Sequence, residues 1–148
     1  MFISYDTIDK AFLSKITEYV LSQLEIGTAQ DMVDSYMKRT IPSFNRVCVY
    51  DLSTYDDKSR MIMTDIDDDD ADEIVDIISE GMVLQWMKPY LYQQDLYENL
   101  LNTKDFTTYS SAELLKQVGN AYERVQRDYT QMIREYSYNH GDLTKLHI

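Results

Sequence analysis

Cysteine, proline and glycine are scarce in this chain: one cysteine, two prolines and four glycines occur among 148 residues. The single cysteine, Cys48, excludes an internal disulfide framework and is typical of a protein that folds in a reducing compartment such as the cytoplasm. With so little proline and glycine, no linker, internal repeat or low-complexity segment stands out. We therefore expect a single domain that is long enough to bury a core.

Long apolar runs and phosphate-binding glycine patterns are also missing. No stretch approaches the ~20 apolar residues that cross a bilayer, and the first six residues do not look like a secretion signal, so we expect no membrane partner. The two histidines, His140 and His147, both lie near the C-terminus and offer too few ligands for a tetrahedral metal site. Without a histidine in the structured part, a catalytic triad has no base. We predict that the protein is not an enzyme and that it has no cofactor and no metal.

Basic residues are outnumbered, with 14 Lys and Arg against 26 Asp and Glu, which gives a net charge of −12. Residues 111–148 hold five basic and five acidic residues, so the acidic excess lies in residues 1–110. An acidic surface repels nucleic acids and anionic membranes. We therefore expect no specific nucleic-acid binding, although an acidic wall would suit a passage through which DNA moves without sticking.

The acidic excess is concentrated in residues 65–76, which contain eight acidic residues and no basic one. Asp65, Asp67 and Asp69 match the first ligand positions of a calcium-binding loop. Asp70, however, stands where that loop needs glycine, and Asp76 stands where it needs glutamate. The pattern therefore favours an acidic helix N-terminus, where carboxylates complement the helix dipole and face solvent or a basic partner.

The spacing of the apolar residues predicts a mainly helical chain. We expect helices at 7–26, at about 28–41 with Pro42 as the stop, at 70–88 with a kink or end at Pro89, at 90–101 and at 111–138. Two β-forming segments, 46–52 and 60–65, flank a turn-rich stretch and predict a small hairpin at about 46–65. The expected fold class is a mainly α helical bundle with this hairpin as an insertion, one long C-terminal helix and an extended tail.

The last predicted helix carries a tyrosine at every seventh position, namely Tyr122, Tyr129 and Tyr136. This stripe suits the spine of the chain's own bundle or a seam between subunits, and the first use is the commoner one. We divide the chain into a helical domain with the hairpin at 1–138 and an extended tail at 139–148.

The tail is unusual because it contains large aliphatic residues that a freely exposed terminus rarely carries. They suit docking onto the same chain, a neighbouring subunit or another protein. The candidate protein-interaction residues are Tyr136, Tyr138, Leu143, Lys145, Leu146, His147 and Ile148.

Two segments, 102–115 (NTKDFTTYSSAELL) and 136–148 (YSYNHGDLTKLHI), resemble segments of virion structural proteins from tailed bacteriophages. The overall plan is similar to that of head-to-tail connector proteins of the neck, also called adaptor or head-completion proteins. The resemblance implies a non-enzymatic ring of twelve copies that lies under the portal protein, contacts the next neck or tail protein and lets DNA pass through. It also implies assembly in the host cytoplasm, a final place in the virion neck, and contact of the C-terminal tail with the portal or a neighbouring subunit.

Two alternatives stay open. One keeps the virion but moves the protein to the tail terminator or the baseplate. The other is an acidic DNA-mimic protein that occupies the nucleic-acid site of a host enzyme. Mimics of this kind spread acidic residues over a surface, whereas this chain gathers many of them in one run.

Overall fold

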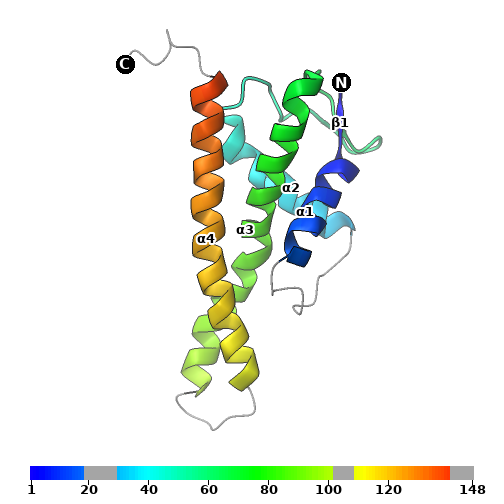
Figure 1. The fold of residues 1–148 in the computed structure, drawn as a ribbon. Coiled ribbons are helices and arrows are strands. Elements are labelled where there is room, and N and C mark those ends of the chain that lie inside the picture. The colour runs from blue at the N-terminus through cyan, green and yellow to red at the C-terminus, as the bar shows by residue number, and fades with distance from the viewer. Residues whose placement is uncertain (19–29, 102–108, 141–148) are drawn as a thin grey trace.

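The computed structural model describes residues 1–18, 30–101 and 109–140. Its described part contains four helices: α1 (Tyr5–Glu18), α2 (Gln30–Asn45), α3 (Asp68–Leu101) and α4 (Tyr109–His140). The central helix is α3, against which α1, α2 and α4 all pack (Figure 1). The mainly α fold class with one long C-terminal helix is therefore confirmed, with α4 about 48 Å long at 1.5 Å per residue.

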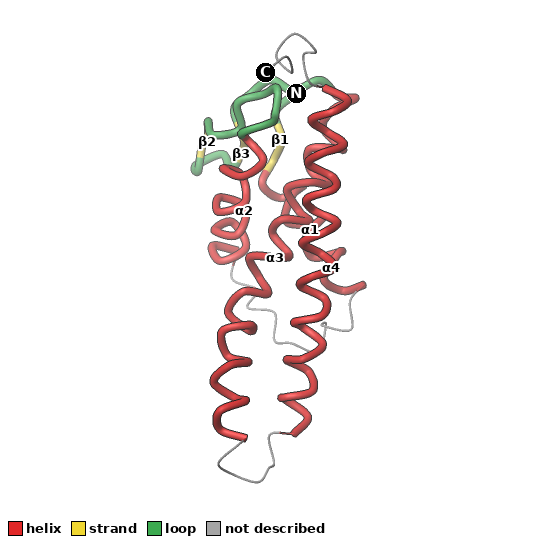
Figure 2. The backbone as a smooth tube through the Cα atoms, turned by 90° about the vertical axis from the view of Figure 1, so that its left-hand side faces the viewer, coloured by secondary structure: helices red, strands yellow, loops and turns green. Residues whose placement is uncertain are grey.

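A small antiparallel sheet lies at the end of the bundle where the chain begins (Figures 1 and 2). It contains β1 (Ile3–Ser4), β2 (Tyr55–Asp56) and β3 (Met61–Ile62) in the order β1-β3-β2. The β2–β3 hairpin falls inside the predicted range of 46–65, but β1 was not predicted.

The prediction of a strand at 46–52 is wrong. This segment forms turns and bends, and its Leu52 is fully buried while the Leu52 N–H donates to the Asn45 side chain at 2.9 Å. Its apolar residues are therefore explained by packing onto the helices from an irregular loop. The free edge of β3 is paired with β1 instead, through the register Ile3 to Ile62.

Both prolines lie inside helices, so the prediction that Pro42 ends the second helix is wrong. Pro42 is exposed in the last turn of α2, and it is flanked by Ile41 and Phe44, which are buried. Burial of these side chains outweighs the backbone hydrogen bond that proline cannot donate. In the same way α3 continues through Pro89 as one helix, where two separate helical pieces were expected.

The predicted tyrosine stripe of α4 faces the chain's own core. Val125, Tyr129 and Tyr136 are buried, while Tyr122 and Met132 are partly buried against the same cluster. The interpretation of this stripe as the spine of the chain's own bundle is confirmed.

Beyond α1 and α2, the bundle narrows to two helices. The C-terminal part of α3 and the N-terminal part of α4 extend past the other two helices and form a projection, which we call the two-helix arm (Figures 1 and 2). The arm points away from the sheet and from the C-terminal end of α4.

Side chains of α2 and α4 pack closely against Gly81 of α3. A Cβ atom at this position would lie 2.3 Å from Thr40 Cγ2 on α2, and 2.8 and 2.9 Å from two ring carbons of Tyr129 on α4. Both neighbours are held in place, because the Thr40 hydroxyl donates to the Tyr36 carbonyl at 2.9 Å and the Tyr129 hydroxyl lies 2.6 Å from Ser43 Oγ. The three-helix crossing therefore needs a residue without a side chain.

Candidate functional site

Of the residues predicted to contact a partner, only Tyr136 and Tyr138 lie in the described part of the chain. Tyr136 is buried, and its hydroxyl accepts a hydrogen bond from the Val49 N–H at 3.2 Å. Its ring packs edge-on against Phe44 with centroids 5.0 Å apart. The side chain of Tyr136 is thus used inside its own domain, whereas Tyr138 is 81% exposed. The other predicted contacts, Leu143, Lys145, Leu146, His147 and Ile148, lie outside the described residues.

The helix α4 extends two residues further than predicted and ends at His140. The His140 ring stacks on Tyr136 with centroids 4.2 Å apart, and its Nε2 lies 3.0 Å from Glu73 Oε1 on α3. A histidine at a helix C-terminus also complements the negative end of the helix dipole when it is protonated. These contacts tie the end of α4 to α3. Residues 139 and 140, which were expected in the extended tail, therefore belong to α4, and the rest of that predicted tail lies outside the described residues.

The acidic run forms the start of α3, as its predicted role at a helix N-terminus requires. Asp68, Asp69 and Asp70 occupy the first turn. Asp70 accepts a hydrogen bond from the Tyr50 hydroxyl at 2.6 Å, which raises the pKa of Tyr50 to about 12. Asp76, further along the run, pairs with Lys15 of α1 at 2.6 Å. The run therefore serves partly as a set of acceptors for its own chain.

A second charged cluster surrounds Arg60, in the tight turn that joins β2 to β3. The Asp56 carboxylate accepts hydrogen bonds from the Lys58 N–H and the Ser59 hydroxyl and so closes this turn. Arg60 itself has a φ of 54°, in the left-handed region that non-glycine residues seldom adopt. The Tyr5 N–H donates to the Arg60 carbonyl at 2.9 Å and holds this backbone against the start of α1.

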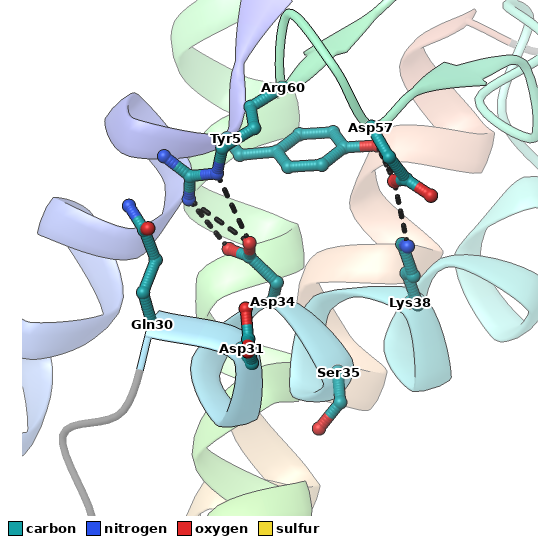
Figure 3. Close-up of a pocket in the computed structure, with 8 residues that line it drawn as sticks. All are labelled: Tyr5, Gln30, Asp31, Asp34, Ser35, Lys38, Asp57 and Arg60. Carbon is teal, nitrogen blue, oxygen red and sulfur yellow. Dashed lines mark hydrogen bonds and ion pairs between the residues drawn. The ribbon is translucent and has the colours of Figure 1, made fainter.

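From this position the Arg60 guanidinium reaches three carboxylates on two helices. It pairs with Asp6 and with Asp9 of α1, the latter at 3.1 Å. It binds Asp34 of α2 with two nitrogens, Nη2 donating to Oδ1 at 2.8 Å and Nε to Oδ2 at 3.2 Å (Figure 3 shows the Asp34 side). Charge-assisted bidentate pairs of this kind are the strongest hydrogen bonds available to side chains. Arg60 therefore joins α1, α2 and the hairpin at one point.

A cavity of about 350 Å³ opens beside this cluster, and its lining includes Tyr5, Gln30, Lys38 and Asp57 (Figure 3). Asp57 accepts a hydrogen bond from the Tyr5 hydroxyl at 3.0 Å and pairs with Lys38 at 2.8 Å. The Asp57 carboxylate is thus bound by both side chains, and these two contacts lower its pKa. Both cations of the cavity wall, Arg60 and Lys38, are already paired with carboxylates, so the cavity is not suited to bind an anion. It is better explained as part of the network of ion pairs that Arg60 forms with Asp6, Asp9 and Asp34, which we call the Arg60 latch.

The electrostatics of this latch centre on Asp9. Burial raises the pKa of Asp9 to about 8, and the neighbouring Asp34 carboxylate adds to the shift by hydrogen bonding and by repulsion, while Arg60 opposes it. Asp9 Oδ1 is buried and has no hydrogen-bond partner among the described residues. The latch therefore holds one carboxyl group that is stabilised by protonation.

Sequence reasoning did not find the Arg60 latch. The only available signal was the spacing of Asp6 and Asp9, which puts both on one side of a helix. Their partner, Arg60, lies more than 50 positions away along the chain, in a segment whose sequence predicts only a turn. Within the described ranges, no group of three or more His, Cys, Asp or Glu side chains is placed to hold a metal ion.

Comparisons with models of protein families, with curated proteins and with solved structures found no match for this chain. In the described part of the chain, no helix has both the length and the apolar character that crossing a membrane requires. The function must therefore be argued from the fold and from the distribution of charge.

Proposed function

We propose that this protein is a non-enzymatic structural subunit of a tailed-bacteriophage neck, where copies of it form a ring that connects the portal and head to the tail and lines the DNA path. Twelve copies are the number that the resemblance implies. The portal protein and the next neck or tail protein are the proposed partners.

The observation that carries this proposal is the two-helix arm. A helix in a globular domain normally buries one face against several neighbours. In the arm, each helix has only the other as a neighbour within the described chain (Figures 1 and 2). Two helices cover only their shared seam, so a projection of this length suits a subunit whose neighbours supply the remaining contacts.

The charge distribution supports the same proposal. A net charge of −12 disfavours a chain that grips DNA but suits a conduit that DNA must slide through. Ring symmetry multiplies each contact, so that individually modest interfaces still give a stable closed assembly.

The test is incorporation into phage particles. A phage deleted for this gene is complemented either with the full chain or with a chain that lacks residues 142–148. We expect the full chain in purified virions and the shortened chain to be absent from them, although circular dichroism shows it folded. Normal incorporation of the shortened chain would contradict the proposed role of the tail, and absence of the full chain from virions would contradict the neck function.

A matched pair of variants separates apolar docking from tail length. Replacement of Leu143, Leu146 and Ile148 by aspartate removes the three aliphatic anchors, and we expect it to act like the deletion. Asp142→Asn with Thr144→Ser changes polar positions in the same segment and should leave incorporation intact. Copurification of the full chain with a host nuclease or polymerase, and not with virions, would instead favour the DNA-mimic alternative.

A further inference from the structure

The outer face of α4 carries a row of basic side chains on an otherwise acidic protein. Arg127 follows Lys116 by 11 residues and Arg134 follows it by 18, which is close to three and five whole helical turns at 3.6 residues per turn. Arg124 belongs to the same stretch of α4. All four are exposed; Lys116, Arg127 and Arg134 lie on the side of α4 opposite the buried Val125 and Tyr136, and Arg124 lies about 80° round the helix from them. We call these four residues the basic row.

None of these four side chains forms an ion pair with another residue of the described chain, whereas Lys15, Lys38 and Arg60 are all paired. The surface next to the row is also hollowed. A shallow depression of about 600 Å³ lies along α4, with Arg127 and Arg134 in its lining. Acidic residues also occur on this surface of α4: Glu123 lies within the row, one turn before Arg127, and Asp128 and Glu135 flank it.

The complementary surface lies at the start of α3. Asp68, Asp69 and Asp72 are exposed on the side of the helix opposite the buried Ile74 and Ile78. We call these three residues the acidic turn. Three other acidic residues of the run are paired within their own chain: Asp65 with the N-terminal amino group, Glu73 with His140 and Asp76 with Lys15. The acidic turn has no ion pair within the described ranges.

We infer that the basic row of one copy docks on the acidic turn of a second copy, and this deepens the proposed function by assigning an interface of the ring. The two surfaces belong to different elements, so each copy can give its basic row to one neighbour and its acidic turn to another. Pairing of two unlike surfaces is the arrangement that generates rings when the rotation closes.

A second copy is favoured over DNA as the occupant because of the charge of the whole chain. With a net charge of −12, a DNA duplex approaching the basic row meets the repulsion of the remaining surface, and DNA offers nothing that pairs with the acidic turn. A second copy satisfies both surfaces at once. Two copies also repel each other at long range, so their attraction acts over about one Debye length, ~8 Å at physiological salt, and depends on correct alignment.

The experiment is a charge swap in the full chain. One variant carries Arg124→Glu, Arg127→Glu and Arg134→Glu, and the other carries Asp68→Lys, Asp69→Lys and Asp72→Lys. We expect the unaltered protein to self-associate in sedimentation-velocity runs taken to several hundred micromolar, and each variant alone to associate at least about tenfold more weakly. An equimolar mixture of the two variants should recover association, because every contact between unlike variants is again attractive.

The control variant is Lys10→Glu, Arg39→Glu and Lys58→Glu, which makes the net charge as much more negative as the basic-row variant does, at exposed positions outside α4. It should associate within about twofold of the unaltered protein. Circular dichroism melts confirm that each variant is folded.

Three results would overturn the inference: no association in the unaltered protein or in the mixture at any concentration, equal weakening by the control variant, or a mixture that does not recover. Binding of a labelled DNA duplex that depends on the basic row, without any effect of the row on self-association, would also overturn it in favour of DNA as the occupant. This test is separate from the test of the neck proposal. If the protein enters virions but fails the charge-swap test, only the proposed interface is contradicted. If it passes the charge-swap test but is absent from virions, only the neck function is contradicted.

Discussion

Replacing Gly81 by alanine tests the packing of the whole bundle with a single methyl group. The new Cβ would lie 2.3 Å from Thr40 Cγ2 and under 3.0 Å from two ring carbons of Tyr129, and hydrogen bonds restrain both neighbours. Overpacking of a tight core costs about 1–3 kcal/mol, and three such contacts put this site near the upper end. Alanine recovers about 1 kcal/mol of helix propensity relative to glycine. We expect Gly81→Ala to lower the free energy of unfolding by about 2 kcal/mol.

The assay is urea unfolding followed by circular dichroism, together with thermal melting. A loss of this size corresponds to a fall in Tm of about 4–8 °C for a chain of this length. Thr40→Ser supplies the internal control, because it removes Cγ2 and keeps the hydroxyl that donates to the Tyr36 carbonyl. In the double variant the shortest contact is gone, so the two substitutions should be non-additive, with a coupling of about 1 kcal/mol in favour of the pair.

The outcome that refutes this reasoning is a Gly81→Ala protein as stable as the unaltered one or more stable. Helix propensity would then dominate, and α2 and α4 could not approach α3 as closely as the structure shows. Strict additivity with Thr40→Ser would place any loss elsewhere than at this contact.

Two further predictions concern groups with shifted pKa values or buried hydroxyls. Because the pKa of Asp9 is raised in the folded protein, the native state holds more protons than the unfolded chain, and stability should fall as pH rises from about 4 to about 8. Asp9→Asn should flatten that part of the profile in unfolding titrations. Tyr136→Phe removes the hydroxyl bonded to the Val49 N–H and should cost about 1 kcal/mol in urea unfolding, whereas Tyr138→Phe on the exposed side should cost nothing measurable.

Each of these has a clear contrary result. A pH profile of Asp9→Asn that still falls between pH 4 and 8 would assign the shift to another group. Equal stability losses in Tyr136→Phe and Tyr138→Phe would mean that the Val49 contact contributes nothing to stability.

The helices were predictable because their signal is local. Apolar residues recur at three- and four-residue spacing along α4, and burial of Val125, Tyr129 and Tyr136 follows directly from that spacing. The acidic start of α3 was predictable for the same reason, since favourable charge at a helix N-terminus depends only on neighbouring positions.

Features that depend on distant segments were not predictable. Pro42 alone predicts the end of a helix, but α2 continues to Asn45 because burial of Ile41 and Phe44 stabilises its last turn. A strand as short as β1 has no periodicity to detect, and it exists only because β3 offers an edge. The Arg60 latch likewise depends on segments that meet only after the helices have packed.

The charges of this chain fall into two groups with different consequences. Arg60 and Lys15 are partly buried among carboxylates of their own chain, and removing either would leave a buried acid, Asp9 or Glu80, without its cation. Substitutions there should change stability and leave association unaltered. The basic row of α4 and the acidic turn of α3 are exposed and without ion pairs in the described chain, so they contribute little to folding. We therefore expect charge reversal at the basic row to lower Tm much less than loss of the Arg60 ion pairs does. An equal fall in Tm would mean that the basic row contributes to folding, and it would contradict the inference that these exposed charges bind a second copy.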